Sequence, residues 1–277
     1  MINRLGVCTW SLQASGLDEL VDRLDACGEK RVQIALCPLL EHAGECSKLQ
    51  THIDSDRIAL CSGMMETVGE DYASLERIKL TGGLRPDEHW DANFERATRC
   101  AELAQDFGVS LVTLHAGFIP EDDPKLHDRM VDRLCRVAEA MNAKGVILGL
   151  ETGQERAETL LELLSTISSR VRVGVNFDPA NMILYGMGDP IESMGLLKEH
   201  IVQVHMKDAN ETDTPGTWGT EVPAGDGQVD WDAFFETVHG LDNKIDVIIE
   251  REAGGQRVMD IRKAHKLASE QIQRVRS

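Results

Sequence analysis

Three short runs between residues 145 and 204 decide the fold: GVILGL (145–150), VRVGVNF (171–177) and IVQV (201–204). A fourth run, DVII, follows at residues 246–249. Each run is rich in β-branched side chains and too short for a solitary helix, so it predicts a buried parallel strand. The residues directly after the runs are ones that a divalent metal accepts, namely Glu151, Asp178, His205 and Glu250. These side chains are therefore predicted at the carboxyl ends of strands, where the packing stops.

The spacing of these four residues predicts that they meet. Glu151 and Asp178 are 27 residues apart, and so are Asp178 and His205. His205 and Glu250 are 45 residues apart, because a long loop intervenes. A step of 27 residues suits one strand, one helix and two turns, so successive candidates come from successive βα units and converge on one rim.

Eight strand-like runs occur along the chain, and most are followed by a segment with the apolar spacing of a helix. The runs are Leu5–Trp10, Val32–Leu36, Ile58–Gly63, Leu111–Gly117, Val146–Glu151, Val173–Asp178, Ile201–His205 and Asp246–Glu250. This alternation predicts a (β/α)8 TIM barrel that forms a single domain over residues 1–277. An open doubly wound sheet would usually carry a glycine-rich phosphate loop after its first strand, where this chain reads TWSLQASG at residues 9–16.

The composition limits the partners. A formal net charge of −18 repels a phosphate backbone, so we expect no nucleic-acid partner. The start of the chain lacks the pattern of a secretory leader, and no apolar run approaches the roughly 20 residues that span a bilayer. We expect a cytoplasmic protein that contacts no membrane and acts on a small molecule. The sequence does not decide whether it forms a homo-oligomer. Seven cysteines without a C-x-x-C pair argue against a disulfide framework and a structural zinc site.

Two connections are longer than a barrel requires. They are Met64–Trp90, after the third predicted strand, and Lys207–Asp230, after the seventh. Long loops in compact domains are usually functional, so both are candidate lids, with decorative insertion as the alternative. The second loop carries Trp218, which could pack on the face of a sugar and is a candidate substrate contact.

The four candidate residues form an oxygen-rich set with one imidazole. Such a set suits one divalent ion, Mn²⁺, Mg²⁺ or Co²⁺, and tolerates Zn²⁺. An octahedral ion with four protein ligands keeps two positions open. Those positions could take the carbonyl and the neighbouring hydroxyl of a ketose.

Five motifs make the sequence resemble the xylose isomerase-like superfamily of TIM barrels, which comprises sugar and sugar-phosphate isomerases and epimerases and also endonuclease IV. The motifs are LHAG at His115, GLETG at Glu151, NFDPAN at Asp178, VHMKD at His205 and IIEREAG at Glu250. In the epimerases of that family, a Glu, an Asp, a His and a second Glu hold one metal, and the two glutamates exchange protons with the substrate. The resemblance implies these roles for Glu151, Asp178, His205 and Glu250, with Glu151 and Glu250 catalytic.

The chain departs from the better-known ketose 3-epimerases of that family at one place. Many of them carry Asp-x-x-His after strand six, whereas this chain reads Asp178-Pro179-Ala180-Asn181. Asn181 cannot act as an acid or base, so it is assigned to binding a substrate hydroxyl. The departure leaves the substrate open.

Further candidates border the four residues. His115 is predicted at the same rim, as a substrate contact or a structural histidine. Lys207 and Arg251 could balance carboxylate charge or bind the substrate, including a phosphate, although as strand neighbours of ligands they could point outward. Glu252 is the alternative to Glu250. Two residues that precede ligands by two positions are expected to contact them, namely Asn176 and Gln203.

The leading prediction is a metal-dependent isomerase or epimerase that acts on a sugar or sugar phosphate. A carboxylate would remove a proton next to a polarised carbonyl, and the ene-diolate would be reprotonated. The alternative is a keto-inositol or keto-sugar dehydratase, a lyase with the same metal site. Less favoured are an endonuclease of the endonuclease IV type, which the charge and Asn181 oppose, and a non-catalytic sugar-binding barrel.

Overall fold

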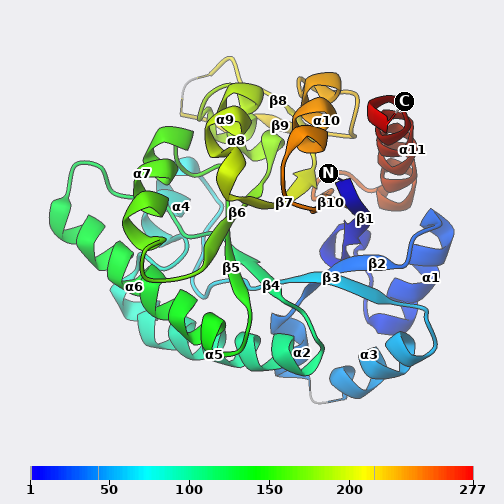
Figure 1. The fold of residues 1–277 in the computed structure, drawn as a ribbon, viewed down its shortest axis with the longest axis horizontal. Helices are drawn as coiled ribbons and strands as arrows, with labels where there is room; N and C mark the ends of the chain where they lie inside the picture. The colour runs from blue at the N-terminus through cyan, green and yellow to red at the C-terminus, as the bar shows by residue number, and fades with distance from the viewer. Residues whose placement is uncertain (1, 43, 215, 277) are drawn as a thin grey trace.

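The chain folds as a closed barrel of eight parallel strands surrounded by helices (Figure 1). The structure is a computed structural model that describes residues 2–42, 44–214 and 216–276. The strands pair around the barrel in the order β1-β10-β7-β6-β5-β4-β3-β2, and β2 pairs with β1 to close it. Their bounds are β1 Ile2–Cys8, β2 Arg31–Ala35, β3 Ala59–Met64, β4 Leu111–Leu114, β5 Ile147–Glu151, β6 Val173–Phe177, β7 Ile201–Met206 and β10 Ile245–Ile249. The predicted (β/α)8 barrel is confirmed.

Helices form the outer layer. The α-helices are α1 Leu17–Cys27, α2 Cys37–Glu41, α3 Glu45–Asp54, α4 Leu75–Thr81, α5 Trp90–Asp106, α6 Pro124–Ala143, α7 Ala157–Ile167, α8 Pro179–Tyr185, α9 Pro190–Leu197, α10 Trp231–Gly240 and α11 Arg257–Arg276. Short 3-10 helices are η1 Thr9–Leu12, η2 Asp87–His89 and η3 Lys198–His200. The last helix, α11, packs beside α1 and α10 and so completes the ring (Figure 1).

Helix α6 illustrates how the sequence determines where a helix of this layer begins and which of its faces is buried. Asp123 caps its N-terminus by accepting hydrogen bonds from the next backbone N–H groups, and Pro124 occupies the first turn, where its missing N–H costs nothing. The face that includes Met130, Leu134 and Met141 is buried against the barrel. Burial of each such side chain contributes about 1.5–3 kcal/mol, so packing orients the helix.

The barrel interior is polar on the way to its carboxyl end. Ser62, Gln203 and Asn176 form a chain there, with Ser62 Oγ 2.6 Å from Gln203 Oε1 and Gln203 Nε2 3.1 Å from Asn176 Oδ1. Gln33 Nε2 donates to Thr113 Oγ1 at 2.8 Å. All five residues are completely buried, and such groups are tolerated only when hydrogen-bonded. This layer supports the side chains above it.

Two predicted strands differ by more than one residue from those in the structure, whereas the other six agree to within one residue at each end. The first begins earlier, at Ile2, and ends at Cys8, because residues 9–12 turn into η1. The fourth ends at Leu114 instead of Gly117. Gly117 has φ of +91°, outside the range of a strand, and its Cα packs so closely on the backbone of Gly82 that an added Cβ would lie 2.3 Å from the Gly82 oxygen.

The loop after β7 contains a hairpin that the sequence did not predict. Its antiparallel strands are β8 Asp208–Asn210 and β9 Thr220–Val222. The buried Asp208 carboxylate holds the base of the loop by accepting hydrogen bonds from four backbone N–H groups and from the Trp231 indole. The lid prediction for Lys207–Asp230 stays a prediction; residue 215 of this loop lies outside the described residues.

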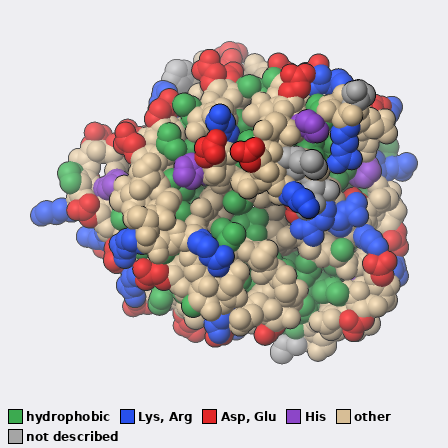
Figure 2. All heavy atoms as spheres, in the orientation of Figure 1, with side chains coloured by type: hydrophobic (Ala, Val, Ile, Leu, Met, Phe, Trp, Pro, Cys, Tyr) green, Lys and Arg blue, Asp and Glu red, His purple; other side chains and the backbone are tan. Residues whose placement is uncertain are grey.

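The surface of the face in Figure 2 carries acidic and basic side chains that intermingle. Within the described ranges, no helix combines the length and the apolar character that crossing a membrane requires.

Candidate metal centre

The four predicted ligand residues converge at the carboxyl end of the barrel. Glu151 is the last residue of β5, and His205 is the penultimate residue of β7. Asp178 and Glu250 directly follow β6 and β10. Asp178 also caps α8, because its Oδ1 accepts the Asn181 N–H at 3.0 Å, which leaves Oδ2 free to face the barrel axis. All four residues are at most 5% exposed.

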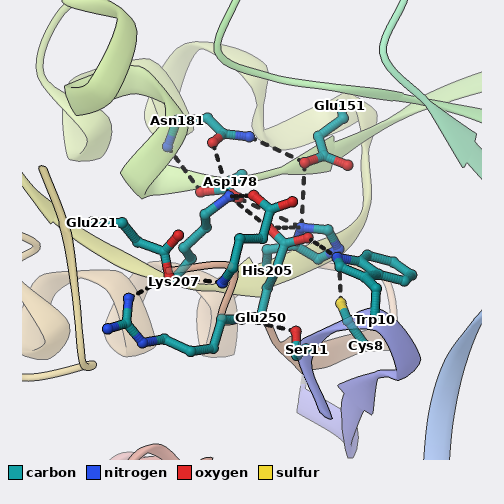
Figure 3. Close-up of polar contacts among 12 residues, drawn as sticks. Cys8, Trp10, Ser11, Glu151, Asp178, Asn181, His205, Lys207, Glu221 and Glu250 are labelled. Atoms are coloured by element: carbon teal, nitrogen blue, oxygen red, sulfur yellow. Dashed lines mark hydrogen bonds and ion pairs between the residues drawn. The ribbon is translucent and has the colours of Figure 1, made fainter. Parts of the chain in front are cut away.

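The four side chains point toward one another (Figure 3). His205 Nδ1 lies 3.4 Å from Glu151 Oε1, 3.5 Å from Asp178 Oδ2 and 3.3 Å from Glu250 Oε2. One ligand atom from each residue lies within 4.8 Å of those of the other three. The predicted set therefore meets at a single point.

Three atoms in this cluster have no hydrogen-bond partner among the described residues. They are Asp178 Oδ2, His205 Nδ1 and Glu250 Oε2, and all are buried. Buried polar atoms without a partner are rare because their desolvation is not offset. A divalent cation between them would satisfy all three, and three carboxylates with one imidazole are a donor set for such an ion. The residues fit a metal.

Polar neighbours hold the ligands in place. Gln33 Oε1 lies 2.7 Å from His205 Nε2, so in the neutral imidazole that a metal requires, Nε2–H donates to Gln33 and the lone pair on Nδ1 faces the cluster. The Trp10 indole donates to Glu250 Oε1 at 2.8 Å, and Asn176 Nδ2 donates to Glu151 Oε2 at 3.1 Å.

The predictions for these neighbours succeeded in part. Asn176 contacts the ligand Glu151 as expected. Gln203 bonds to Asn176 and Ser62, so its expected contact with a ligand is indirect. Sequence reasoning missed Gln33 and Trp10, which come from the first two units of the barrel. A glutamine in the middle of the apolar run VQIA was the available signal for Gln33.

The charges around the cluster favour ionised glutamates. Burial raises the pKa of Glu250, but the nearby Lys207 and His205 outweigh it and hold the pKa well below its ordinary value. Burial raises the pKa of Glu151, but the positive charges of His115 and His205 lower it by more. The pKa of Glu151 is therefore also below its ordinary value. Ionised carboxylates can act as metal ligands and as bases.

Lys207 is buried among acidic groups. Burial lowers the pKa of Lys207, but Glu250, Glu252 and Asp178 outweigh it and raise the pKa well above its ordinary value. Its Nζ lies 3.0 Å from Glu250 Oε2, and it also pairs with Glu252. Glu252, the alternative ligand, thus contacts Lys207, and it is Glu250 that belongs to the four-residue cluster.

A cavity of about 660 Å³ adjoins the cluster. His115 and Asn181 line it, and both contact Glu151: His115 Nε2 lies 3.5 Å from Glu151 Oε1, and Asn181 Nδ2 donates to the same oxygen at 3.1 Å. The loop after β3 contributes Thr67, Glu70 and other residues to the wall. This candidate lid therefore borders the site.

Three predicted substrate contacts are not among the described lining residues, and the first is Lys207, whose ammonium is paired with Glu250 and Glu252. Neither Arg251 nor Trp218 is among the described residues that line this cavity. Arg251 is buried in ion pairs with Glu221, at 2.6 Å, and Asp260, at 2.9 Å, which tie the β9 strand to the start of α11. Trp218 packs edge-on against Tyr185, at 4.8 Å between ring centroids, and Tyr185 lines the cavity. Trp218 thus supports the wall from behind.

The chain belongs to the xylose isomerase-like TIM barrel family, whose model matches residues 67–277. A xylose isomerase domain protein from Planctomyces limnophilus is 27% identical, with a TM-score of 0.87 over 99% of this chain and 98% of that one. The fold is also similar to a probable 3-DHS dehydratase from Bacillus anthracis, with 17% identity and a TM-score of 0.74 over 96% and 98% of the chains. An L-ribulose 3-epimerase is 14% identical, with a TM-score of 0.73 over 100% and 96%. No curated protein matches the sequence significantly.

Proposed function

We propose that this protein is a divalent-metal-dependent isomerase or epimerase that transfers a proton within a sugar through an ene-diolate. The observation that carries the proposal is the meeting of Glu151, Asp178, His205 and Glu250 at one point, where three buried atoms make no hydrogen bond; of these, Glu250 Oε2 also forms an ion pair with Lys207. Membership of a family with sugar-modifying members supports it.

Each residue has a role in this proposal. Glu151, Asp178, His205 and Glu250 hold the metal, which when bound polarises the substrate carbonyl and acidifies the neighbouring C–H. Glu151 and Glu250 come from β5 and β10, which are not adjacent in the barrel, so their carboxylates approach the reacting carbons from different sides. One carboxylate removes the proton, and either the same one or the other returns it.

The neighbours orient these groups and the substrate. The Trp10 and Lys207 contacts on Glu250, and the Asn176 and Asn181 contacts on Glu151, restrict each carboxylate to one geometry. Pre-organised groups need little rearrangement during the reaction. His115, with Nε2 toward Glu151 and the cavity, binds a substrate oxygen.

The test is proton exchange. The Mn²⁺-loaded enzyme is incubated in D₂O with a panel of ketoses, and deuterium incorporation beside the carbonyl is followed by NMR. Glu151→Gln and Glu250→Gln keep the shape and remove the base, so each is expected to lower the exchange rate about 10²- to 10⁴-fold. Glu158→Gln, on the outer helix α7, is the control.

Metal analysis accompanies this assay. Asp178→Asn and His205→Ala are expected to lose the ion, and unchanged stoichiometry in both would contradict the site. An active Glu151→Gln, Glu250→Gln double variant would exclude the proton-transfer roles.

A dehydratase is the second candidate, because the fold is shared with a probable dehydratase and both reactions begin with removal of a proton beside a carbonyl. The same experiment separates the two. An isomerase or epimerase changes the substrate mass only by the deuterium that it incorporates, whereas a dehydratase produces a compound that is lighter by one water.

A further inference from the structure

We propose that the substrate is an uncharged keto-sugar, with its ketone on a ring carbon and an apolar aglycone on the anomeric carbon, and that a second cavity between η1, α1 and α2 binds the aglycone. The sugar end of this inference rests on the proposed function. The second cavity is an observation of its own.

The second cavity has a volume of about 600 Å³ and adjoins the first. Trp10, Gln13 and Glu66 line both cavities, so the two spaces meet along this border. Much of its remaining wall is apolar, with side chains from α1, β2, α2 and the turn before α1, while Thr9, Ser15, His42 and Glu45 add polar groups. The apolar side chains include Ala14, Leu17, Leu20, Ile34, Pro38 and Leu39. The volume is within the range of small-molecule sites.

Trp10 links this wall to the metal centre. Its indole N–H is held by Glu250 Oε1 at 2.8 Å, and its ring meets the His205 ring edge-on at 6.4 Å between centroids (Figure 3). The partition between the cavities therefore has a defined position relative to the proposed reacting carbons. Gln13, also on the border, has φ of +50°, which is unusual for a residue other than glycine and is found preferentially at functional sites.

The charges of the first cavity disfavour a phosphate. Arg257 is the single basic residue among its described lining residues, apart from His115, and its guanidinium donates to the carbonyl oxygens of Arg251, Glu252 and Gly254. Lys207, behind the wall, is paired with carboxylates. Glu66, Glu70 and Glu252 add carboxylates to the lining. A phosphate would meet these negative charges without a free cation, whereas sugar hydroxyls would find acceptors.

The apolar wall identifies the rest of the ligand. When an apolar group covers apolar surface in an open cavity, the binding free energy becomes more favourable in proportion to the area removed from water. A sugar alone offers hydroxyls to that wall. A sugar with an apolar ring at one end places its hydroxyls beside the metal centre and its ring beyond Trp10, so both cavities receive groups of matching polarity.

The test compares binding of paired glycosides. Methyl and phenyl β-D-glucopyranoside, and the galactose and xylose pairs, are titrated calorimetrically into the full-length Mn²⁺-loaded protein. The phenyl member of at least one pair is expected to bind about tenfold or more tightly than the methyl member, since a ring buries about 100 Å² of apolar surface. Equal affinities in all pairs, or no binding by any glycoside, would overturn the proposal.

Two variants locate the effect. Pro38→Asp places a charge on an exposed part of the second cavity, and Ala14→Trp narrows it; each is expected to reduce the phenyl preference below about threefold while methyl glycosides bind as before. Leu196→Asp, an equally polar change at an exposed position on α9, is the control. A preference that survives both variants, or dimers that dissociate on Pro38→Asp because a second copy covers this wall, would overturn the assignment.

These results are independent of the proton-exchange assay. Ketose exchange without a phenyl preference would refute the aglycone site and retain the proposed function. A phenyl preference without exchange on any ketose would refute the proposed function and retain the aglycone site.

Discussion

Replacing Gln33 by methionine should weaken metal binding although Gln33 is not itself a ligand. Gln33 Oε1 lies 2.7 Å from His205 Nε2, and both residues are completely buried. In the neutral imidazole, this bond keeps the proton on Nε2 and leaves the Nδ1 lone pair for an ion. Methionine keeps the length of the side chain and removes the acceptor.

The magnitude follows from this geometry. A buried donor that loses its partner costs about 1–3 kcal/mol, and each 1.4 kcal/mol is a factor of ten in an equilibrium constant. The lost hydrogen bond destabilises the metal-free protein as well, so only part of this free energy appears as weaker metal binding. We expect metal affinity to fall about 10- to 100-fold, the range seen when the hydrogen-bond partner of a metal ligand is removed.

The assay is calorimetric titration of Mn²⁺ into the metal-free protein, with thermal melting to establish that the variant is folded. Gln203→Met is the matched control, because Gln203 is also a fully buried glutamine of the barrel interior but bonds to Ser62 and Asn176 instead of a ligand. Its metal affinity should change less than about threefold. Wild-type affinity in folded Gln33→Met, or an equal loss in Gln203→Met, would refute the reasoning.

Three other predictions concern the scaffold. Gly227→Ala would place a Cβ 2.1 Å from Asp208 Oδ1, so urea denaturation should show about 1–3 kcal/mol less stability, whereas Gly240→Ala, with open space around it, should not. Burial raises the pKa of Glu155 from 4.5 to about 8. The protein should therefore be most stable where Glu155 is protonated in both states, below pH 4.5, and should lose several kcal/mol of stability as the pH rises to about 8. Denaturation at pH 5 and pH 8 should show this loss, and Glu155→Gln should make it smaller. Trp218→Ala should raise KM several-fold in steady-state kinetics with the melting temperature nearly unchanged, because its indole supports the cavity wall; unaltered kinetics would exclude that role.

The barrel and the ligand set could be predicted because both depend on local pattern. A buried parallel strand is mostly apolar on both faces, so a Glu, Asp or His directly after such a run indicates where the packing stops. Four such endings in successive units specify the rim on which Glu151, Asp178, His205 and Glu250 lie. The closed strand order confirms the barrel.

The neighbours of the ligands were harder to predict, because their partners are distant in the sequence. Gln33 and His205 are 172 residues apart, and Trp10 and Glu250 are 240 apart. No spacing rule relates such residues until barrel closure brings the first strands beside the last. Arg251 shows the converse: a charged residue next to a ligand resembled a site residue, but strand geometry turns it toward Glu221 and Asp260.

The sequence by itself thus determined the architecture and the four candidate ligand residues, since strand length, helix period and the position of polar endings are properties of short segments. Only the tertiary structure decided which atom of His205 faces the three carboxylates, which residues contact the two glutamates, and that Trp10 lines both a polar and a more apolar cavity. These features depend on the closure of the barrel, which sets distances between side chains that the chain separates by most of its length.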